Sequence, residues 1–168
     1  MELDKTSVYT DIKNILEQAK NNAVRAVNFS MVLAYWQIGK RIVEDEQGGN
    51  KKANYGEYLL KDLSEKLSAE FGKGFTYRNI AAMRQFYLAF PILHAARAES
   101  SKEKNTSIGN EVLDQSMDIS IRDTLRPELS WSHYRLLMKV ENPDARNYYI
   151  QECIGQNWST RTYKRIIH

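Results

Sequence analysis

A helical apolar period from about residue 6 to residue 47 is the feature that most limits what this chain can fold into. Apolar residues recur there at steps of three and four, the spacing that keeps them on one face of an α-helix. They are Val8, Ile12, Ile15, Leu16, Ala19, Ala23 and Val27, followed by Met31, Leu33, Tyr35, Trp36, Ile38 and Ile42. Gly48, Gly49 and Asn50 end the pattern. The sequence predicts one long helix, or two helices joined near residues 28–30, that is either a dimer seam or a scaffold packed along its own domain.

A shorter pair of helices with a tight turn between them is predicted next. Residues 55–71 alternate an apolar face and a charged face at helical spacing. Residues 72–75 contain two glycines and predict the turn, and Thr76 is a suitable cap for a helix from Tyr77 to Phe90, which Pro91 ends. This layout of helix, turn and helix is typical of helix-turn-helix units.

Composition changes after this pair of helices and divides the chain. Residues 98–120 are polar and without period, which predicts a linker over 98–128 between residues 1–97 and a helical lobe over 129–168. We expect the two parts to pack as one domain. Residues 119–125 leave room for one short strand or wing, so the predicted class is an all-α, helix-turn-helix-like bundle with a long N-terminal helix.

Three helices are predicted in the C-terminal lobe. The first starts at Ser130 or Ser132 and runs through Val140. Asn142 followed by Pro143 predicts the start of the second, which Gly155 closes. Trp158 and Ser159 open the last helix, at residues 160–167.

The outward face of the predicted helix 77–90 is suited to a DNA groove. At 100° per residue, Ile80, Met83, Phe86, Tyr87 and Phe90 gather on the inner side. Arg78 and Gln85 lie on the other side among Ala81, Ala82 and Ala89, so the backbone can approach bases closely while arginine pairs with guanine and glutamine with adenine. Arg84 and Tyr77 flank this face, placed for phosphate contacts, and residues 72–98 contain four basic residues and no acidic one. A solvated face of good helix formers is the alternative interpretation.

A second set of basic residues lies near the end of the chain. Arg161 and Arg165 are four residues apart with Lys164 beside them, and Arg135 and Lys139 repeat this spacing on an otherwise apolar helix. Like charges at this spacing repel, so an anionic partner would relieve the cost, although ordinary solvation accounts for them as well. Trp36, Trp131 and Trp158 occur at helical spacing in apolar stretches, which favours core positions over base-stacking platforms.

Several classes of protein are disfavoured by composition. A net charge of +3 is weak support for a polyanion partner, so the argument depends on where the charges lie. Cys153 is the single cysteine and the three histidines are scattered, so we expect no disulfide, no metal site and no cofactor. Asp11, Ile12 and Lys13 match part of a nuclease motif but lie on a predicted helix, where surface charge is the better explanation. With no apolar leader or membrane span, a cytoplasmic location is expected.

Three blocks of the sequence resemble a known family. They are MVLAYWQIGKRIVEDEQ, YGEYLLKDLSEKLSAEFGKGFTYRNIAAMRQFYLAFP and LSWSHYRLLMKVENPDARNYYIQECIGQNWSTRTYKRII, with YWQIGKRIVE, FGKGF, LSWSHYRLLM and NWSTR the most specific parts. The chain thereby resembles the N-terminal domain of the YhcG-like family of bacterial proteins. Two departures are a longer polar stretch at 98–120 and Tyr163 where leucine is expected.

The resemblance implies a helix-turn-helix-like or winged-helix domain that precedes a PD-(D/E)xK nuclease domain. The catalytic acids and lysine of that second domain have no positions in these 168 residues, so the chain is expected to be a cut or truncated N-terminal part and not itself an enzyme.

The function predicted from the sequence is therefore a non-catalytic domain that targets a nuclease to double-stranded DNA. Arg78, Gln85 and Arg84 are placed at the groove with Tyr77 beside them, and the phosphate contacts are assigned to Lys73, Arg161, Lys164 and Arg165. The alternative is a protein-interaction or homodimerisation module without DNA affinity. A third possibility, that the chain itself cleaves DNA, finds no support in its residues.

Overall fold

The computed structural model describes residues 3–48, 55–91 and 124–167, with the side chains of residues 3–6 left aside. Within these ranges the chain forms six α-helices and one 3-10 helix and contains no strand, which confirms the all-α prediction. The elements are α1 (Leu3–Gln47), α2 (Tyr55–Phe71), the 3-10 helix η1 (Lys73–Phe75), α3 (Tyr77–Ala89), α5 (Trp131–Leu137), α6 (Pro143–Gly155) and α7 (Thr160–Ile166).

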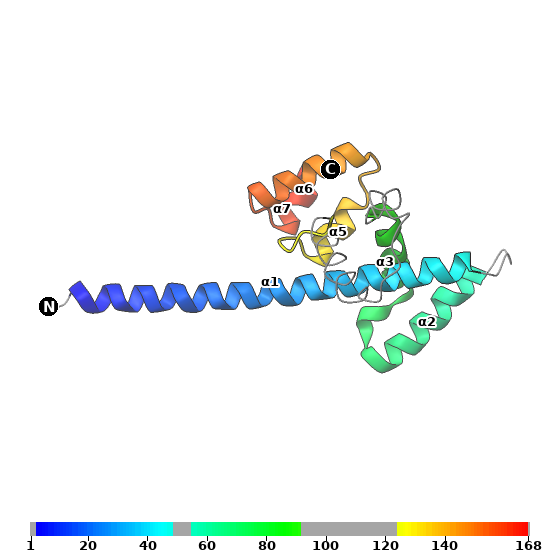
Figure 1. The fold of residues 1–168 in the computed structure, drawn as a ribbon, viewed down its shortest axis with the longest axis horizontal. Helices are drawn as coiled ribbons and strands as arrows, with labels where there is room; N and C mark the ends of the chain where they lie inside the picture. The colour runs from blue at the N-terminus through cyan, green and yellow to red at the C-terminus, as the bar shows by residue number, and fades with distance from the viewer. Residues whose placement is uncertain (1–2, 49–54, 92–123, 168) are drawn as a thin grey trace, which may run out of the picture.

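The first helix is one continuous rod of 45 residues, not two helices joined near residue 29. Its N-terminal half projects away from the rest of the molecule, and every side chain from residue 7 to residue 28 is exposed (Figure 1). Its C-terminal half, from residue 29 onward, carries α2, α3 and the C-terminal helices. We call that half of α1 together with α2–α7 the globular end.

The closest approach inside the globular end is between α1 and α3. Gly39 of α1 is buried, and a Cβ atom built on it would lie 2.1 Å from the backbone oxygen of Met83. A hydrogen at that position therefore lets the two helix backbones touch. One turn earlier, the Trp36 ring is 4% exposed and its Nε1 donates a hydrogen bond of 2.9 Å to the Phe90 carbonyl oxygen. This bond satisfies a carbonyl at the end of α3 that has no partner within its own helix.

Two clusters of buried side chains make up the core. The larger one contains residues from α1, α3 and all three C-terminal helices, with Tyr134 and Tyr163 its largest fully buried side chains. The smaller one joins Ile42, Leu60 and Ile80 from α1, α2 and α3. The C-terminal helices therefore share a core with α1 and α3.

The end of the predicted linker belongs to this core. Leu125 is fully buried and Leu129 is 2% exposed, so these two leucines anchor the described end of the linker, whereas Pro127 and Glu128 between them are exposed. Residues 98–123, the bulk of that linker, lie outside the described ranges. Of the possible strand at 119–125, Thr124 and Leu125 are described and neither forms a strand. The boundaries of the two parts remain a prediction.

Local signals in the sequence set most of the helix ends. Gly72 has φ of 85°, which favours glycine, and Thr76 caps α3 by accepting from the backbone N–H of Asn79. Asn142 caps α6 in the same way. Gly155 is the last helical residue of α6, but Asn157, with φ of 52°, takes the left-handed position that a terminal glycine was expected to fill.

Of the expected core residues of α3, Ile80, Met83, Phe86 and Phe90 are buried and Tyr87 is partly buried. Cys153 is buried and free, and desolvation raises the pKa of its thiol to about 11, so it is an inert filler at neutral pH. None of the described helices combines the length and apolarity that crossing a bilayer requires.

Candidate nucleic-acid interface

The start of α5 is held against the start of α3. Trp131 Nε1 donates a hydrogen bond of 3.0 Å to Asn79 Oδ1, directly after Arg78 in the sequence. The Trp131 ring also lies 5.2 Å from the Phe86 ring and 5.1 Å from the Tyr35 ring, measured between centroids. Because α5 starts there, its next turns run along the side of α3 that carries Arg78.

His133 fixes the other side of α5. Its Nδ1 accepts from the backbone N–H of Ser130 at 3.2 Å, and its Nε2 lies 3.1 Å from the Trp158 carbonyl oxygen, just before α7. A neutral ring with its proton on Nε2 satisfies both contacts. Burial lowers the pKa of His133, opposed in part by the bond to Trp158, which agrees with a neutral ring. The cap of α5 thus connects this helix to the base of α7.

A groove of about 680 Å³ lies between α3 and α5. We call it the α3–α5 groove, and its lining residues are Tyr77, Arg78, Ala81, Ala82, Gln85, Arg135, Met138, Lys139 and Glu141. The outward face of α3 that the sequence singled out is therefore one wall of a groove, and α5 with the turn after it forms the other. Arg78 and Gln85 are exposed, whereas Ala81 and Ala82 between them are partly buried.

A second groove, of about 500 Å³, lies on the other side of α5. This α5–α7 groove is lined by Ser132, Arg135, Leu136, Lys139, Thr160, Arg161 and Lys164. Arg135 and Lys139 line both grooves, so they form a ridge between them. Arg78 and Arg161 consequently flank the same ridge, and the two basic sets seen in the sequence adjoin one another.

Among the described residues, the five groove cations have no acidic partner, in contrast to Arg41 and Arg84, which pair with Asp45 and Glu46. Arg78, Arg135, Lys139, Arg161 and Lys164 are all exposed, and within the described part of the chain none of them forms an ion pair. Glu141 is the acidic residue among the lining side chains, and the α5–α7 groove has none. The combined surface is therefore strongly positive.

Arg146 shows what a structural arginine looks like in this fold. Its Nη1 donates to the Ala89 carbonyl oxygen at 2.8 Å, and its Nε and Nη2 donate to the Val140 carbonyl oxygen at 3.1 and 2.8 Å. Its guanidinium also lies 5.3 Å from the centre of the Phe90 ring. These bonds connect α6 with the end of α3 and with the turn that precedes α6.

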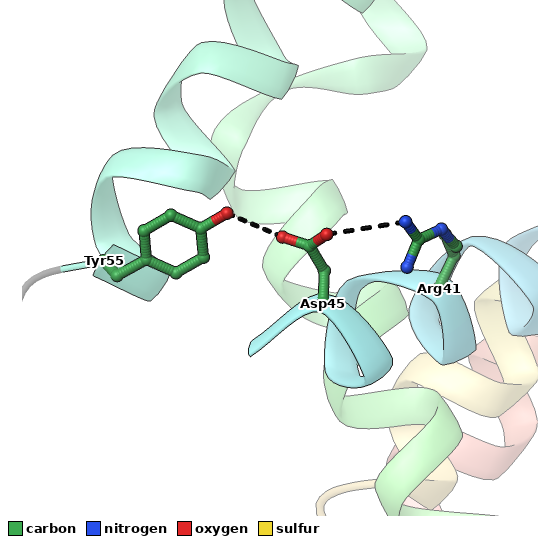
Figure 2. Close-up of polar contacts among 3 residues, drawn as sticks. All are labelled: Arg41, Asp45 and Tyr55. Atoms are coloured by element: carbon green, nitrogen blue, oxygen red, sulfur yellow. Dashed lines mark hydrogen bonds and ion pairs between the residues drawn. The ribbon is translucent and has the colours of Figure 1, made fainter. Parts of the chain in front are cut away.

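Arg84 is structural in the same sense, although the sequence placed it beside the groove. Its Nε donates to Glu46 Oε2 at 2.7 Å, which joins α3 to the end of α1, and it does not line either groove. The neighbouring acid, Asp45, accepts from the Tyr55 hydroxyl at 2.7 Å and from Arg41 at 3.4 Å, as Figure 2 shows. These acids connect α1 with α2 and α3.

The remaining predicted site residues divide between the grooves and their surroundings. Tyr77, Arg78, Gln85, Arg161 and Lys164 line a groove. Lys73, in η1, and Arg165, on α7, are exposed but line neither groove.

The ridge residues Arg135 and Lys139 were absent from the site predicted from the sequence. Their four-residue spacing on an apolar helix was visible in the sequence. Nothing in the sequence indicated that α5 would lie between α3 and α7.

The described residues do not provide the ligand cluster that a catalytic metal site requires. They contain no group of three or more His, Cys, Asp or Glu side chains arranged to hold a metal ion. Asp11 and Lys13 are exposed on the projecting half of α1.

Comparison with known proteins agrees with the sequence blocks. "Putative nuclease YhcG" of Escherichia coli (strain K12) is 34% identical over 163 residues, which is 95% of this chain and 44% of that protein. The chain thus spans less than half the length of this relative. No solved structure matches the chain. The model of the family described as "DUF1016 N-terminal domain" matches residues 11–168, and the chain therefore belongs to that family.

Proposed function

We propose that this domain binds double-stranded DNA through the paired grooves and thereby targets a nuclease domain, carried by the same protein, to its substrate. The observation that carries the proposal is the ridge of Arg135 and Lys139, with unpaired cations on both sides. Lysine and arginine side chains that have no protein acid nearby are free to neutralise phosphates and release condensed counterions. Because the relative is named as a putative nuclease, we take the polyanion to be a nucleic acid.

In this proposal the two grooves make different kinds of contact with DNA, one to phosphates and the other to base edges. Arg135, Arg161 and Lys164 lie on short helices anchored in the core, and Lys139 lies in the turn directly after α5, which suits contacts that position a DNA backbone. Arg78 and Gln85 flank short alanine side chains on α3, where a base edge can come close enough to be read. The proposal therefore gives α2, η1 and α3 the role of a helix-turn-helix unit, in which α3 reads the bases. Contacts to the DNA backbone are assigned to α5 and α7.

Salt dependence provides the first test. Fluorescence anisotropy with a labelled duplex should give an association constant whose logarithm falls linearly with the logarithm of the salt concentration. Four phosphate contacts predict a slope of about −3.6. Between 50 and 200 mM salt, a slope of this size corresponds to roughly a hundredfold loss of affinity. No binding at low salt, or binding without such a slope, would overturn the proposal.

A matched pair of double variants locates the surface. Arg135→Ala with Lys139→Ala should weaken binding and reduce the steepness of the salt slope by about 2, since each lost phosphate contact removes about one unit. Lys61→Ala with Lys66→Ala removes the same charge from the exposed side of α2 and should leave the slope unchanged. Thermal melting checks that neither pair alters the fold. An equal loss of affinity in both pairs would show that total charge, not the ridge, governs binding.

Base reading is tested separately. Replacing Arg78 and Gln85 by alanine should reduce the difference in affinity between a preferred and a scrambled duplex, while the salt slope changes little. A change in slope without a change in preference would move these two residues to the phosphate contacts.

A further inference from the structure

The projecting half of α1 carries an apolar stripe on which no other described part of the chain is packed. The stripe consists of Val8, Ile12, Ile15, Leu16, Ala19, Ala23, Ala26 and Val27. Its largest members are 51–64% exposed, and all eight lie in the stretch where every side chain is exposed. At 100° per residue they fall within a sector of about 120°, with polar residues over most of the rest of the helix.

This stripe does not continue the face that packs in the globular end. The buried residues Val32, Trp36, Gly39, Ile42 and Val43 are centred about 160° away from the stripe on the same helical wheel. The apolar face therefore changes sides near residue 29. A helix lying on the stripe is thus on the side of α1 away from α3.

The stripe is divided into large and small residues. Ile12, Ile15 and Leu16 lie toward the N-terminus, and Ala19, Ala23 and Ala26 follow toward the globular end. Helix axes approach to 8–10 Å depending on the side chains between them. Two parallel copies would place large against large and alanine against alanine, whereas two antiparallel copies place large residues on alanines and keep the separation even.

We propose that a second copy of this chain covers the stripe, as an antiparallel helix pair whose two-fold axis passes between Glu17 and Gln18. In this register Leu16 lies opposite Ala19 of the second copy, Ile12 opposite Ala23, and Val8 opposite Val27. The spacing of the stripe supports it, because 8 and 19, 12 and 23, and 16 and 27 are each 11 residues apart. That interval is close to three helical turns, so the contact stays on one face.

Charge is complementary along one edge of the stripe in the same register. Asp11 borders one edge of the stripe, and Arg25 borders the same edge near its other end. In an antiparallel pair like edges face one another, so Asp11 comes within one residue of Arg25 of the second copy. The symmetric contact is formed as well.

The length of the contact is adequate for a stable pair. Residues 8–27 span about 30 Å of helix, and sixteen apolar side chains are covered when two copies combine. The two globular ends then lie at opposite ends of the helix pair, which leaves the grooves on α3, α5 and α7 free. The inference does not depend on the proposed DNA binding.

Multi-angle light scattering and sedimentation of the 168-residue chain give the first test. We expect a dimer that dissociates on dilution. Ile15→Glu with Leu16→Glu should yield a monomer at all concentrations. The matched control is Val24→Glu, since Val24 is also exposed, at 52% against 63% for Ile15 and 64% for Leu16, but lies outside the stripe, about 60° beyond its edge. Far-ultraviolet circular dichroism monitors the helix in each variant.

Cysteine crosslinking tests the orientation. When chains with Ile12→Cys are mixed with chains with Ala23→Cys, an antiparallel pair forms the mixed disulfide, because the two positions lie opposite each other. Either chain alone should not crosslink, since like positions are 11 residues, or about 16 Å, apart along the axis. Buried Cys153 does not compete.

Three results would overturn the inference. A monomer across the whole concentration range would show that no second copy binds. Loss of the dimer in Val24→Glu as well as in the stripe variant would show that the contact is not the stripe. Self-crosslinking of Ile12→Cys alone would show a parallel pair.

Discussion

The two halves of α1 have the same local signals but opposite surroundings. Both halves repeat apolar residues at helical spacing, and both form one uninterrupted helix. From Val32 onward the apolar side chains are covered by α2, α3 and α5–α7, whereas Val8 to Val27 remain exposed. Periodicity thus determines that a segment is helical and which side is apolar, but it leaves open what covers that side.

The tightest contact of the covered half gives the largest expected effect. Gly39→Val would place a branched side chain where even a Cβ lies 2.1 Å from the Met83 carbonyl oxygen. Backbone cannot rotate away as a side chain can, so we expect a loss of more than about 3 kcal/mol of unfolding free energy. That loss corresponds to a melting temperature lower by roughly 6–12 °C, measured by denaturation monitored by circular dichroism.

Gly74→Val is the control for this substitution. A Cβ on Gly74 meets no atom within 4 Å, so the same side chain should cost less than about 1 kcal/mol there. If Gly39→Val melted like the wild-type chain, the close crossing of α1 and α3 would be wrong.

A valine in each half provides a matched pair of intermediate size. Val32 is 0% exposed and Val27 is 64% exposed, five residues apart on the same helix. Val32→Ala should cost about 2 kcal/mol, from lost transfer free energy and the cavity left behind. Val27→Ala should change the unfolding free energy by less than about 0.5 kcal/mol when measured at concentrations where the chain is monomeric. At higher concentration, Val27→Ala should instead weaken self-association.

Most of the fold was predictable because its signals are local. Thr76, Asn142 and Ser159 each cap a helix with a side chain that the sequence displays, and Gly72 adopts the backbone angle that its lack of a side chain permits. The change of apolar face near residue 29 was missed, because the step from Val27 to Met31 keeps helical spacing while α3 contacts a different side of the helix. That choice is made by Gly39 and the residues of α3 it touches, which are distant in the sequence.

The candidate site was half predictable for the same reason. Arg78 and Gln85 follow from the wheel of a single helix, and both line the α3–α5 groove. The ion pair of Arg84 could not be predicted, because its partner, Glu46, is 38 residues away and a pair over that distance has no local signature. The position of the ridge of Arg135 and Lys139 depends on the hydrogen bond between Trp131 and Asn79, two residues that are 52 positions apart in the sequence.

The smallest expected effect is a pH dependence that belongs to the globular end alone. Burial lowers the pKa of His133 in the folded chain, so the unfolded chain, with the ordinary value near 6.5, takes up the proton more readily. The contribution of His133 to the free energy of unfolding is therefore fully present above about pH 6.5 and is lost as the pH falls below that value. The ring keeps some contact with solvent, which limits the size of the effect.

Melting temperatures at pH 7.5 and 5.5 measure this dependence. The wild-type chain should melt lower at pH 5.5, and His133→Gln should show a smaller difference, because the group that titrates has been removed while α5 keeps its Ser130 cap. Carboxylates titrate in both proteins, so the difference between the two chains isolates His133. Residues 7–28 contain no histidine, so the dissociation constant of the helix pair should stay the same over this interval. Greater stability of the wild-type chain at pH 5.5 than at pH 7.5 would contradict the neutral, hydrogen-bonded ring that connects α5 to the base of α7.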